Sequence, residues 1–389
     1  MSTRTRLLLL CVSAPLLAFV LIGGVLGRQA SGQEAYPHLR VFEDVVSLIV
    51  QNYVEEVDVD RVMEGALRGL ADGLDADSAY LAPDQVRAVE RGDPLPEGDV
   101  GLTLTRRYYL QVVSARDGSP AARAGLRPQD YVRAIDGRPT RDMSVFEGAR
   151  LLRGAPGSKV TLTVIRGNAA DPHQVVLVRE KPAAQEVTGR LLEPGLGYVR
   201  VPAFDARTAA RLRARIAELE KAGAARLIVD LRGTAEGPLD SGLEAARLFV
   251  ASGTLAIRAA RDEARRPIAA AAGDGAIRLP TVLLVNSGTA GAAELFAAAL
   301  AGNGRAETIG ERTRGRAGLQ KLVPLPHGRG LWLTWAAYLT PSGEPIHEKG
   351  LAPTVEVEEP EEEFGAARSE GAAADPILEK AVARLKATG

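Results

Sequence analysis

The side chains that could carry covalent chemistry gather in the last third of the chain. Ser287 and Thr289 follow the apolar run Thr281–Val285 and precede an alanine-rich helix that is expected to begin near Ala292. A hydroxyl group in such a turn is a useful nucleophile only where a neighbouring base takes its proton. Arginines such as Arg316, which follow in the sequence, cannot be that base, because a guanidinium stays protonated and has no lone pair to offer. The two hydroxyls are therefore more simply explained as turn and cap residues ahead of the helix.

Other catalytic groups are scattered. The four histidines are far apart in the sequence, namely His38, His173, His327 and His347. The single cysteine, Cys11, lies in an N-terminal apolar run, so the rest of the chain has neither a disulfide nor a thiol nucleophile. No Cys/His pair has metal-ligand spacing and no glycine-rich phosphate loop follows a strand, so neither a metal nor a cofactor is expected. The 48 basic and 49 acidic residues are interspersed, which predicts no nucleic-acid partner.

The run Asn286–Glu294 reads Asn-Ser-Gly-Thr-Ala-Gly-Ala-Ala-Glu. It resembles the nucleophile loop N-x-G-S-A-S-A-S-E of the C-terminal processing peptidases, the tail-specific serine/lysine peptidases of family S41. The catalytic serine of that family falls on Gly291. The family's base lysine lies in a T-x-G-K-x-x-x-Q motif, which this chain matches with Thr313, Gly315, Arg316 and Gln320. The resemblance therefore implies a site that has lost both its nucleophile and its base.

A third segment of the same family lends a backbone N–H to the oxyanion hole and reads D-L-R-N-N-P-G-G. Here Asp230–Gly237 reads Asp-Leu-Arg-Gly-Thr-Ala-Glu-Gly, so Glu236 replaces the first glycine of the closing pair. By resemblance, the residues of the oxyanion turn are Glu236, Gly237 and Ala292. The Glu236 carboxylate would oppose developing negative charge if it pointed into the hole. Two other nearby acids, Glu294 and Glu311, are expected to be helix and surface charges.

Changes in composition predict five segments. They are an export signal or signal anchor at 1–33, a helical region at 34–93, a domain of short β runs at 98–182, an α/β core at 187–358, and an acidic linker with a terminal helix at 359–389. In the first segment, Arg4 and Arg6 precede an uncharged apolar run at 7–26. If uncleaved, this run would contact the inner membrane, and in either case the body is expected in the periplasm or cell envelope.

The segment 98–182 resembles a PDZ domain in the order and spacing of its turn residues. In such a domain an extended peptide adds a strand to a sheet edge, and a glycine-rich loop holds the terminal carboxylate. By resemblance this loop is Gly101, Leu102, Thr103 and Leu104, with Thr103 in place of a glycine. A helix near Val145–Leu152 is expected to shape an apolar pocket with Phe146, Ala149 and Leu152. The alternative is a PDZ domain that only packs against its neighbour.

From residue 187 onward, strands alternate with helices, as in a sheet covered by helices. Buried strands are expected at Arg226–Leu231 and Thr281–Val285, with an amphipathic helix at Asp205–Ala222. The fold class is α/β (α+β), and the resemblance implies a ClpP/crotonase-like peptidase core with an inserted PDZ domain and a small N-terminal helical region. A last amphipathic helix is expected from a cap at Asp375 to Lys386.

Leu74–Leu81 resembles a further family segment, L-D-P-H-S-x-Y-L. The structural role that best explains these residues is that of a helix terminus. Asp77 or Ser78 would then cap the helix that follows Pro83.

The resemblance implies a homologue that binds polypeptide C-termini or unfolded tails through its PDZ domain and no longer cuts them. Such a pseudopeptidase would act as a scaffold or regulator. Arg316 and Arg314 would receive a carboxylate in the former base pocket, or Arg316 would pair with Glu236 and close the site. Two alternatives stay open. One is an active serine endopeptidase that uses Thr289 or Ser287, and the other is a homo-oligomer or an adaptor subunit of an active paralogue.

Overall fold

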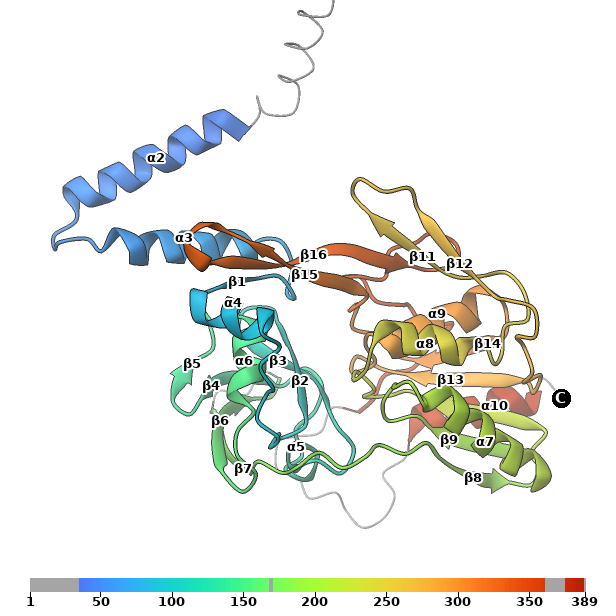
Figure 1. Cartoon of the computed structure of the whole chain (residues 1–389). Helices are drawn as coiled ribbons and strands as arrows, with labels where there is room; N and C mark the ends of the chain where they lie inside the picture. The colour runs from blue at the N-terminus through green and yellow to red at the C-terminus, as the bar shows by residue number, and fades with distance from the viewer. Residues whose placement is uncertain (1–34, 168–170, 361–374, 388–389) are drawn as a thin grey trace, which may run out of the picture. The chain divides into compact units, whose positions relative to one another are not determined.

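The computed structural model describes residues 35–167, 171–360 and 375–387 (Figure 1). The predicted export segment and the acidic run 361–363 lie outside these ranges. Within them, no helix combines the length and the apolar character that a membrane span needs. The chain divides into two units, Met1–Gly69 and Leu70–Gly389, and every predicted site residue belongs to the second.

The first unit contains one helix and most of a second, both within the predicted helical region 34–93. They are α2 (Ala35–Asn52) and α3 (Val59–Asp72). Large apolar side chains of α2 are open to solvent, with Leu39 and Val41 each 60% exposed and Leu48 58% exposed. An apolar stripe of this kind is usually covered by another element or another chain.

The predicted PDZ domain is a β-sheet with two short helices. Its elements are β2 (Leu102–Arg106), β3 (Leu110–Ala115), α5 (Pro120–Arg123), β4 (Tyr131–Ile135), β5 (Arg138–Pro139), α6 (Val145–Leu151), β6 (Lys159–Ile165) and β7 (His173–Val178). The main strands lie in the order β2-β3-β4-β6-β7. Strand β2 therefore lies at one edge, with β3 as its neighbour in the sheet. A peptide could extend the sheet only from an edge of this kind.

The α/β core is built on a second sheet with mostly parallel strands. Its strands are β8 (Thr188–Glu193), β9 (Leu196–Arg200), β10 (Arg226–Asp230), β13 (Thr281–Val285), β14 (Ala306–Gly310) and β17 (Val355–Glu356). Their order is β17-β14-β13-β10-β9-β8, and β8 alone among the described strands of this sheet runs antiparallel to its neighbour. The carboxyl ends of β9, β10 and β13 thus meet at one edge, which is where the predicted site loops begin.

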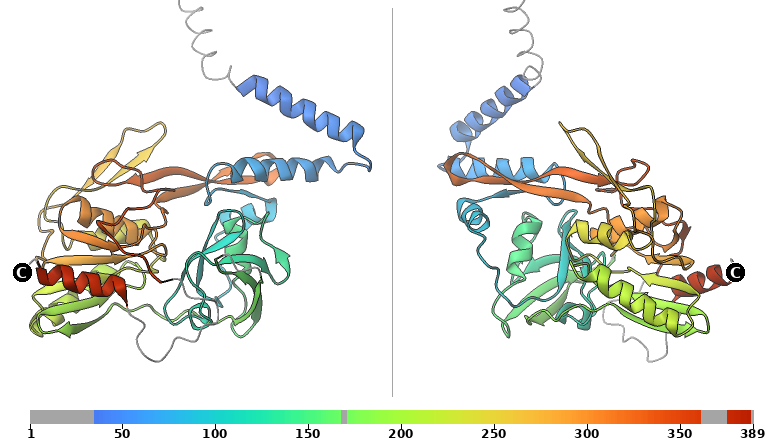
Figure 2. Two further views of the ribbon diagram at one scale, coloured as in Figure 1. Left: turned by 180° about the vertical axis from the view of Figure 1, so that it is seen from behind. Right: turned by 45° about the vertical axis from the view of Figure 1, so that its right-hand side comes forward.

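Helices cover both faces of this sheet, as Figure 2 shows from two sides. One face packs against α7 (Thr208–Lys221), α8 (Leu239–Ala246) and α9 (Ala292–Gly302). The opposite face packs against α10 (Pro376–Ala387). Asp375 accepts from the backbone N–H of Leu378 at 2.9 Å, which confirms the predicted cap of this helix.

A third sheet lies against the other side of α8 and α9. It contains β1 (Ala79–Leu81), β11 (Thr254–Ala260), β12 (Arg266–Ala269), β15 (Gly318–Pro324) and β16 (Gly330–Leu339), with the turn η1 (Pro326–Gly328) between the last two. Strand β1 pairs antiparallel with β16, from Ala79 opposite Trp332 to Leu81 opposite Gly330. The N-terminal region thus contributes a strand to the sheet that carries the predicted base loop.

The helix that follows β1 is α4 (Pro83–Glu90), and the prediction for its cap is wrong. The N-cap is Ala82, whose backbone N–H donates to the Gln85 side chain at 2.9 Å. Ser78 instead donates its hydroxyl to Asp75 at 3.1 Å and accepts from the backbone N–H of Thr334 at 3.2 Å. The local cap signals mislead here, because contacts with the distant strand β16 hold this segment.

Candidate active site

Glu294, in the first turn of α9, holds the two predicted dyad positions together. Its side chain is completely buried. One carboxylate oxygen accepts from the backbone N–H of Gly291 at 2.9 Å and from that of Arg316 at 2.7 Å. The other accepts from the backbone N–H of Gly315 at 2.6 Å and from the Thr313 hydroxyl. The loops at 291 and 316, far apart in sequence, therefore meet at a single carboxylate.

The interpretation of Glu294 as a simple helix charge is wrong, because it organises the site. Glu294 supplies the glutamate half of a capping box, because it accepts from the N-cap N–H three residues before it, while the glycine N-cap has no side chain to complete the motif. Burial raises the pKa of Glu294, while its four donors favour the ionised form. Glu311 also supports the loop, accepting from the backbone N–H of Ser287 at 3.1 Å.

Gly291 is the N-cap of α9 and has φ +64° and ψ −121°. This conformation strongly favours glycine. A Cβ built at this position would lie 3.7 Å from the Leu239 side chain and 3.8 Å from the Arg316 carbonyl oxygen, which are ordinary contacts. The next residue, Ala292, opens α9, so its N–H has no partner within the helix. The position has room for a small side chain beside a helix N-terminus, but carries no reactive group.

Arg316 uses its guanidinium to join three parts of the molecule. Its Nη2 donates to Asp77 at 2.6 Å, and its Nη1 donates to the Leu104 carbonyl oxygen of β2 at 3.3 Å. Asp77 occupies the place of the histidine in the family segment L-D-P-H-S-x-Y-L. The residue at the predicted base position and the residue facing it thus form an ion pair.

Glu236 is bound by a different arginine, so the predicted ion pair between Glu236 and Arg316 is wrong. Arg116 of the PDZ domain donates through Nη1 to both Glu236 oxygens, at 3.1 and 3.3 Å. The Nη2 of Arg116 donates to Asp99 at 3.1 Å. Burial raises the pKa of Glu236, and Arg116 opposes that shift.

The neighbouring Gly237 has φ +120°, and a Cβ there would lie 1.7 Å from the Phe204 carbonyl oxygen. Only glycine therefore fits the second position of the closing pair, which is retained.

The hydroxyl of Thr289 is fully committed to structure. It is buried, accepts from the backbone N–H of Asn286 at 3.0 Å and donates to the Leu231 carbonyl at 2.9 Å. Thr289 thus behaves as a turn residue that ties the loop to the end of β10.

Gln320, the last residue of the matched base motif, lies in β15 and donates to the Thr334 hydroxyl at 3.2 Å.

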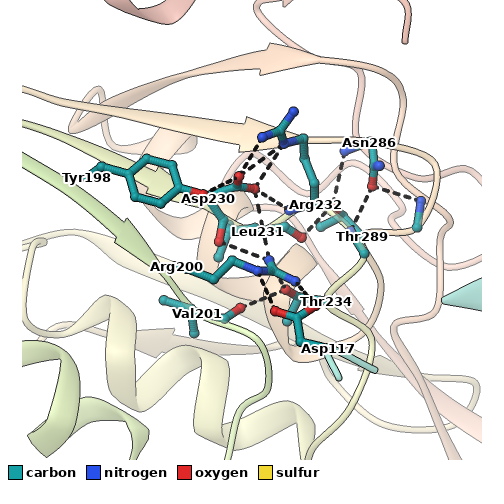
Figure 3. Close-up of polar contacts among 12 residues, drawn as sticks. Asp117, Tyr198, Arg200, Val201, Asp230, Leu231, Arg232, Thr234, Asn286 and Thr289 are labelled. Carbon is teal, nitrogen blue, oxygen red and sulfur yellow. Dashed lines mark hydrogen bonds and ion pairs between the residues drawn. The ribbon is translucent and has the colours of Figure 1, made fainter. Parts of the chain in front are cut away.

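A polar network that was not predicted fixes the turn after β10 (Figure 3). Asp230 is buried and accepts from the Tyr198 hydroxyl at 2.8 Å and from the Arg232 guanidinium at 2.7 Å. Arg200 donates to the Thr234 hydroxyl at 2.9 Å and pairs with Asp117 of the PDZ domain at 3.0 Å. Neutralisation by two arginines lets a buried aspartate anchor the turn.

The same network reaches the C-terminal helix. Arg232 donates to Asp375, the cap of α10, at 2.8 and 2.9 Å. Next to it lies an open cavity of about 740 Å³, lined by residues of the PDZ domain, the ends of β9 and β10, and the flanks of the acidic segment. The arginines and aspartates of this network are dispersed in the sequence, so no local pattern predicts that they pair.

The residues of the predicted peptide pocket of the PDZ domain lie in different surroundings. Gly101 has φ +79° and immediately precedes β2, as the predicted loop requires. Leu152 cannot line an open groove, because it is 1% exposed within the core of the domain. Phe146 packs against Trp332 of β16, with ring centroids 6.1 Å apart, whereas Ala149 is exposed on α6.

The other loop residues belong to β2. Thr103 lies opposite Ser114 of β3, while the carbonyl oxygen of Leu104 accepts from Arg316. Leu102 lies opposite Ala115. The β2 edge of the PDZ domain therefore contacts the candidate site directly.

His347 provides a pH-dependent contact beside the site. Its Nε2 lies 3.7 Å from a carboxylate oxygen of Asp75, and neither ring nitrogen has a hydrogen-bond partner in the described ranges. Burial acts to lower the pKa of His347, but Asp75, Asp77 and Glu348 outweigh it and raise the value above 6.5. A raised folded-state pKa stabilises the fold fully below the unfolded value, and this contribution is lost as pH rises through the folded value.

We expect the stability of the wild-type protein to fall between pH 6 and pH 8 relative to that of His347→Gln, which carries no titratable group there. Urea unfolding at a series of pH values measures this difference. Parallel pH profiles would show that the Asp75 contact contributes no net stabilisation.

Comparison with known proteins agrees with this architecture. The model of peptidase family S41 matches residues 195–357, and a PDZ-domain model matches residues 111–166. The carboxy-terminal processing protease CtpA of Bacillus subtilis is 30% identical over 342 residues, which cover 87% of this chain and 72% of that protein. A carboxy-terminal-processing protease of Bartonella bacilliformis is also 30% identical, over 334 residues that cover 84% of this chain and 77% of that protein.

A solved structure extends the likeness to the fold. The photosystem II D1 C-terminal processing protease matches with a TM-score of 0.67 at 28% identity, over 82% of this chain and 92% of that one. The predicted α/β peptidase core, PDZ domain and N-terminal helices are confirmed. The chain therefore belongs to the C-terminal processing peptidases of family S41 that carry a PDZ domain.

Proposed function

We propose that this protein binds polypeptide C-termini without cleaving them. The observation that carries the proposal is the pair of positions joined at Glu294, where Gly291 has no side chain and Arg316 is held in an ion pair with Asp77. Peptide hydrolysis by this family's chemistry needs a hydroxyl nucleophile and a neutral amine. A glycine and a guanidinium supply neither group.

The PDZ domain supplies the binding function, because such domains accept peptide C-termini along a sheet edge. The acceptor is β2, which starts beside Gly101 at the edge of its sheet. We further propose that the body is exported and works in the cell envelope, since residues 1–33 have the composition of an export signal.

The test is to incubate the full-length chain, purified in detergent, with a reduced and unfolded protein that has an apolar C-terminus. We expect the protein to co-elute with this substrate and the substrate mass to stay unchanged. Ser287→Ala and Thr289→Ala serve as paired controls. Cleavage that disappears in either variant would establish a rearranged nucleophile and overturn the proposal.

One observation favours a second role as an adaptor. The apolar side chains of α2 are exposed, and a partner protein would cover them. The polar side of α2 includes Glu43 and Asp44 with one arginine, Arg40, which suits an anionic membrane surface poorly. Co-purification of an active paralogue, lost when Val41 and Leu48 are changed to serine, would support this role.

A further inference from the structure

Arg116 lies at the start of the PDZ domain's peptide-accepting edge. Its backbone N–H donates to the Gly101 carbonyl oxygen at 2.8 Å. Its Nη2 would lie 3.2 Å from a Cβ built on Gly101. The Arg116 side chain is 9% exposed, so its charge is largely removed from water. A desolvated guanidinium beside the first residue of the loop is a receptor for a carboxylate.

The outer carboxylate on this receptor comes from the peptidase domain. Arg116 binds two acids, of which Asp99 is 10% exposed and Glu236 is 31% exposed. Asp99 is also held by the backbone N–H of Val100 at 2.7 Å, whereas the described contacts of the Glu236 carboxylate are all with Arg116. Glu236 is therefore the exchangeable partner of Arg116. Its side chain ends in a carboxylate, the same group that ends a polypeptide chain.

Strand β2, which lies next to Arg116, is also contacted by a side chain of the α/β core. An added peptide strand would donate its own N–H groups to outward-facing carbonyl oxygens of β2. One of these acceptors, the Leu104 carbonyl, is taken by the Arg316 guanidinium at 3.3 Å. The two residues that replace the family's glycine and lysine thus both contact the peptide-accepting edge.

We propose that Glu236 is an internal ligand of the PDZ domain, which occupies Arg116 in place of a polypeptide's terminal carboxylate while Arg316 covers the Leu104 carbonyl. A C-terminal tail then binds by displacing both side chains. This inference rests on the proposed function and specifies the regulation of its binding site. The measured dissociation constant of a tail is then the intrinsic constant divided by the fraction of molecules whose β2 edge is free.

The test uses a fluorescein-labelled decapeptide with three apolar C-terminal residues, prepared as the free acid and as the C-terminal amide. Anisotropy titrations with the full-length protein give the affinities. Glu236→Gln is expected to bind the acid about 10-fold more tightly and the amide no more tightly, since a tenfold change requires only about 1.4 kcal/mol. Arg116→Gln should bind acid and amide equally, and adding Glu236→Gln to it should bring no gain. An equal gain for acid and amide, or a gain that persists without Arg116, would overturn the inference.

A second measurement separates this inference from the proposed function, because it needs no peptide. Hydrogen exchange of residues 102–106 should accelerate in Glu236→Gln/Arg316→Gln and remain unchanged in Glu307→Gln, a surface control. Unchanged exchange in the double variant would refute the internal ligand even if peptides bind. Accelerated exchange with no peptide binding by any variant would retain the contact and refute tail binding.

Discussion

Reinstalling four residues is expected to turn this protein into a working peptidase. The variant carries Gly291→Ser, Arg316→Lys, Asp77→His and Glu236→Gly. We expect it to trim an unfolded protein about 10²-fold to 10⁴-fold faster than the same variant that keeps Arg316, the usual contribution of a positioned general base. Mass spectrometry of the substrate measures the rate.

The geometry supports this expectation. Position 291 has the room for a side chain, and its strained φ, costing about 1–3 kcal/mol for a non-glycine residue, is held by the Glu294 contact to its N–H. Asp77 must change as well, because a carboxylate 2.6 Å from the present guanidinium would keep a lysine protonated there. The neutral amine that proton transfer requires would then be absent.

Partial restorations are the controls for this prediction. Gly291→Ser alone should be inactive, since Arg316 cannot accept the proton. Activity of that single variant equal to the activity of the fourfold variant would place the base elsewhere. If the fourfold variant folds but does not cleave the substrate, something other than these four residues prevents catalysis.

The largest loss of stability is expected from Glu294→Ala. This change leaves three backbone N–H groups and the Thr313 hydroxyl without their buried acceptor. At about 1–3 kcal/mol for each unsatisfied group, offset in part by water that enters the space, the free energy of unfolding should fall by about 4 kcal/mol. Urea unfolding followed by the fluorescence of Trp332 and Trp335 measures it.

Glu307→Ala is the matched control for this prediction. Glu307 forms an exposed ion pair with Arg384, at 2.7 Å, and its removal should cost less than about 1 kcal/mol. Equal losses in the two variants would mean that the Glu294 contacts contribute no more than a surface pair.

The sequence predicts the fold well where one segment carries its own signal. Apolar runs such as Thr281–Val285 are buried strands, and Asp375 caps the last helix as expected. Strand β1 was missed, because its three residues are too few for a period and their pairing partner is more than 200 positions away along the chain.

The candidate site shows the same division. The matched motifs predict that Gly291 and Arg316 share one site, and the structure brings the two positions together, since Glu294 joins their backbones. The partners of the charged side chains were not predictable, because an ion pair depends on which segments meet in space. Glu236 therefore pairs with Arg116 rather than with Arg316, and Asp77 serves as a counter-ion rather than a helix cap.

The pairing of Asp77 with Arg316 also limits what single substitutions at these positions can achieve. Asp77→His alone would strip a partly enclosed guanidinium of its partner. Arg316→Lys alone would keep the charge and still provide no base. Under the proposed function, each single step toward a serine/lysine site is thus either harmful or useless, so that chemistry could be gained only through several changes made together.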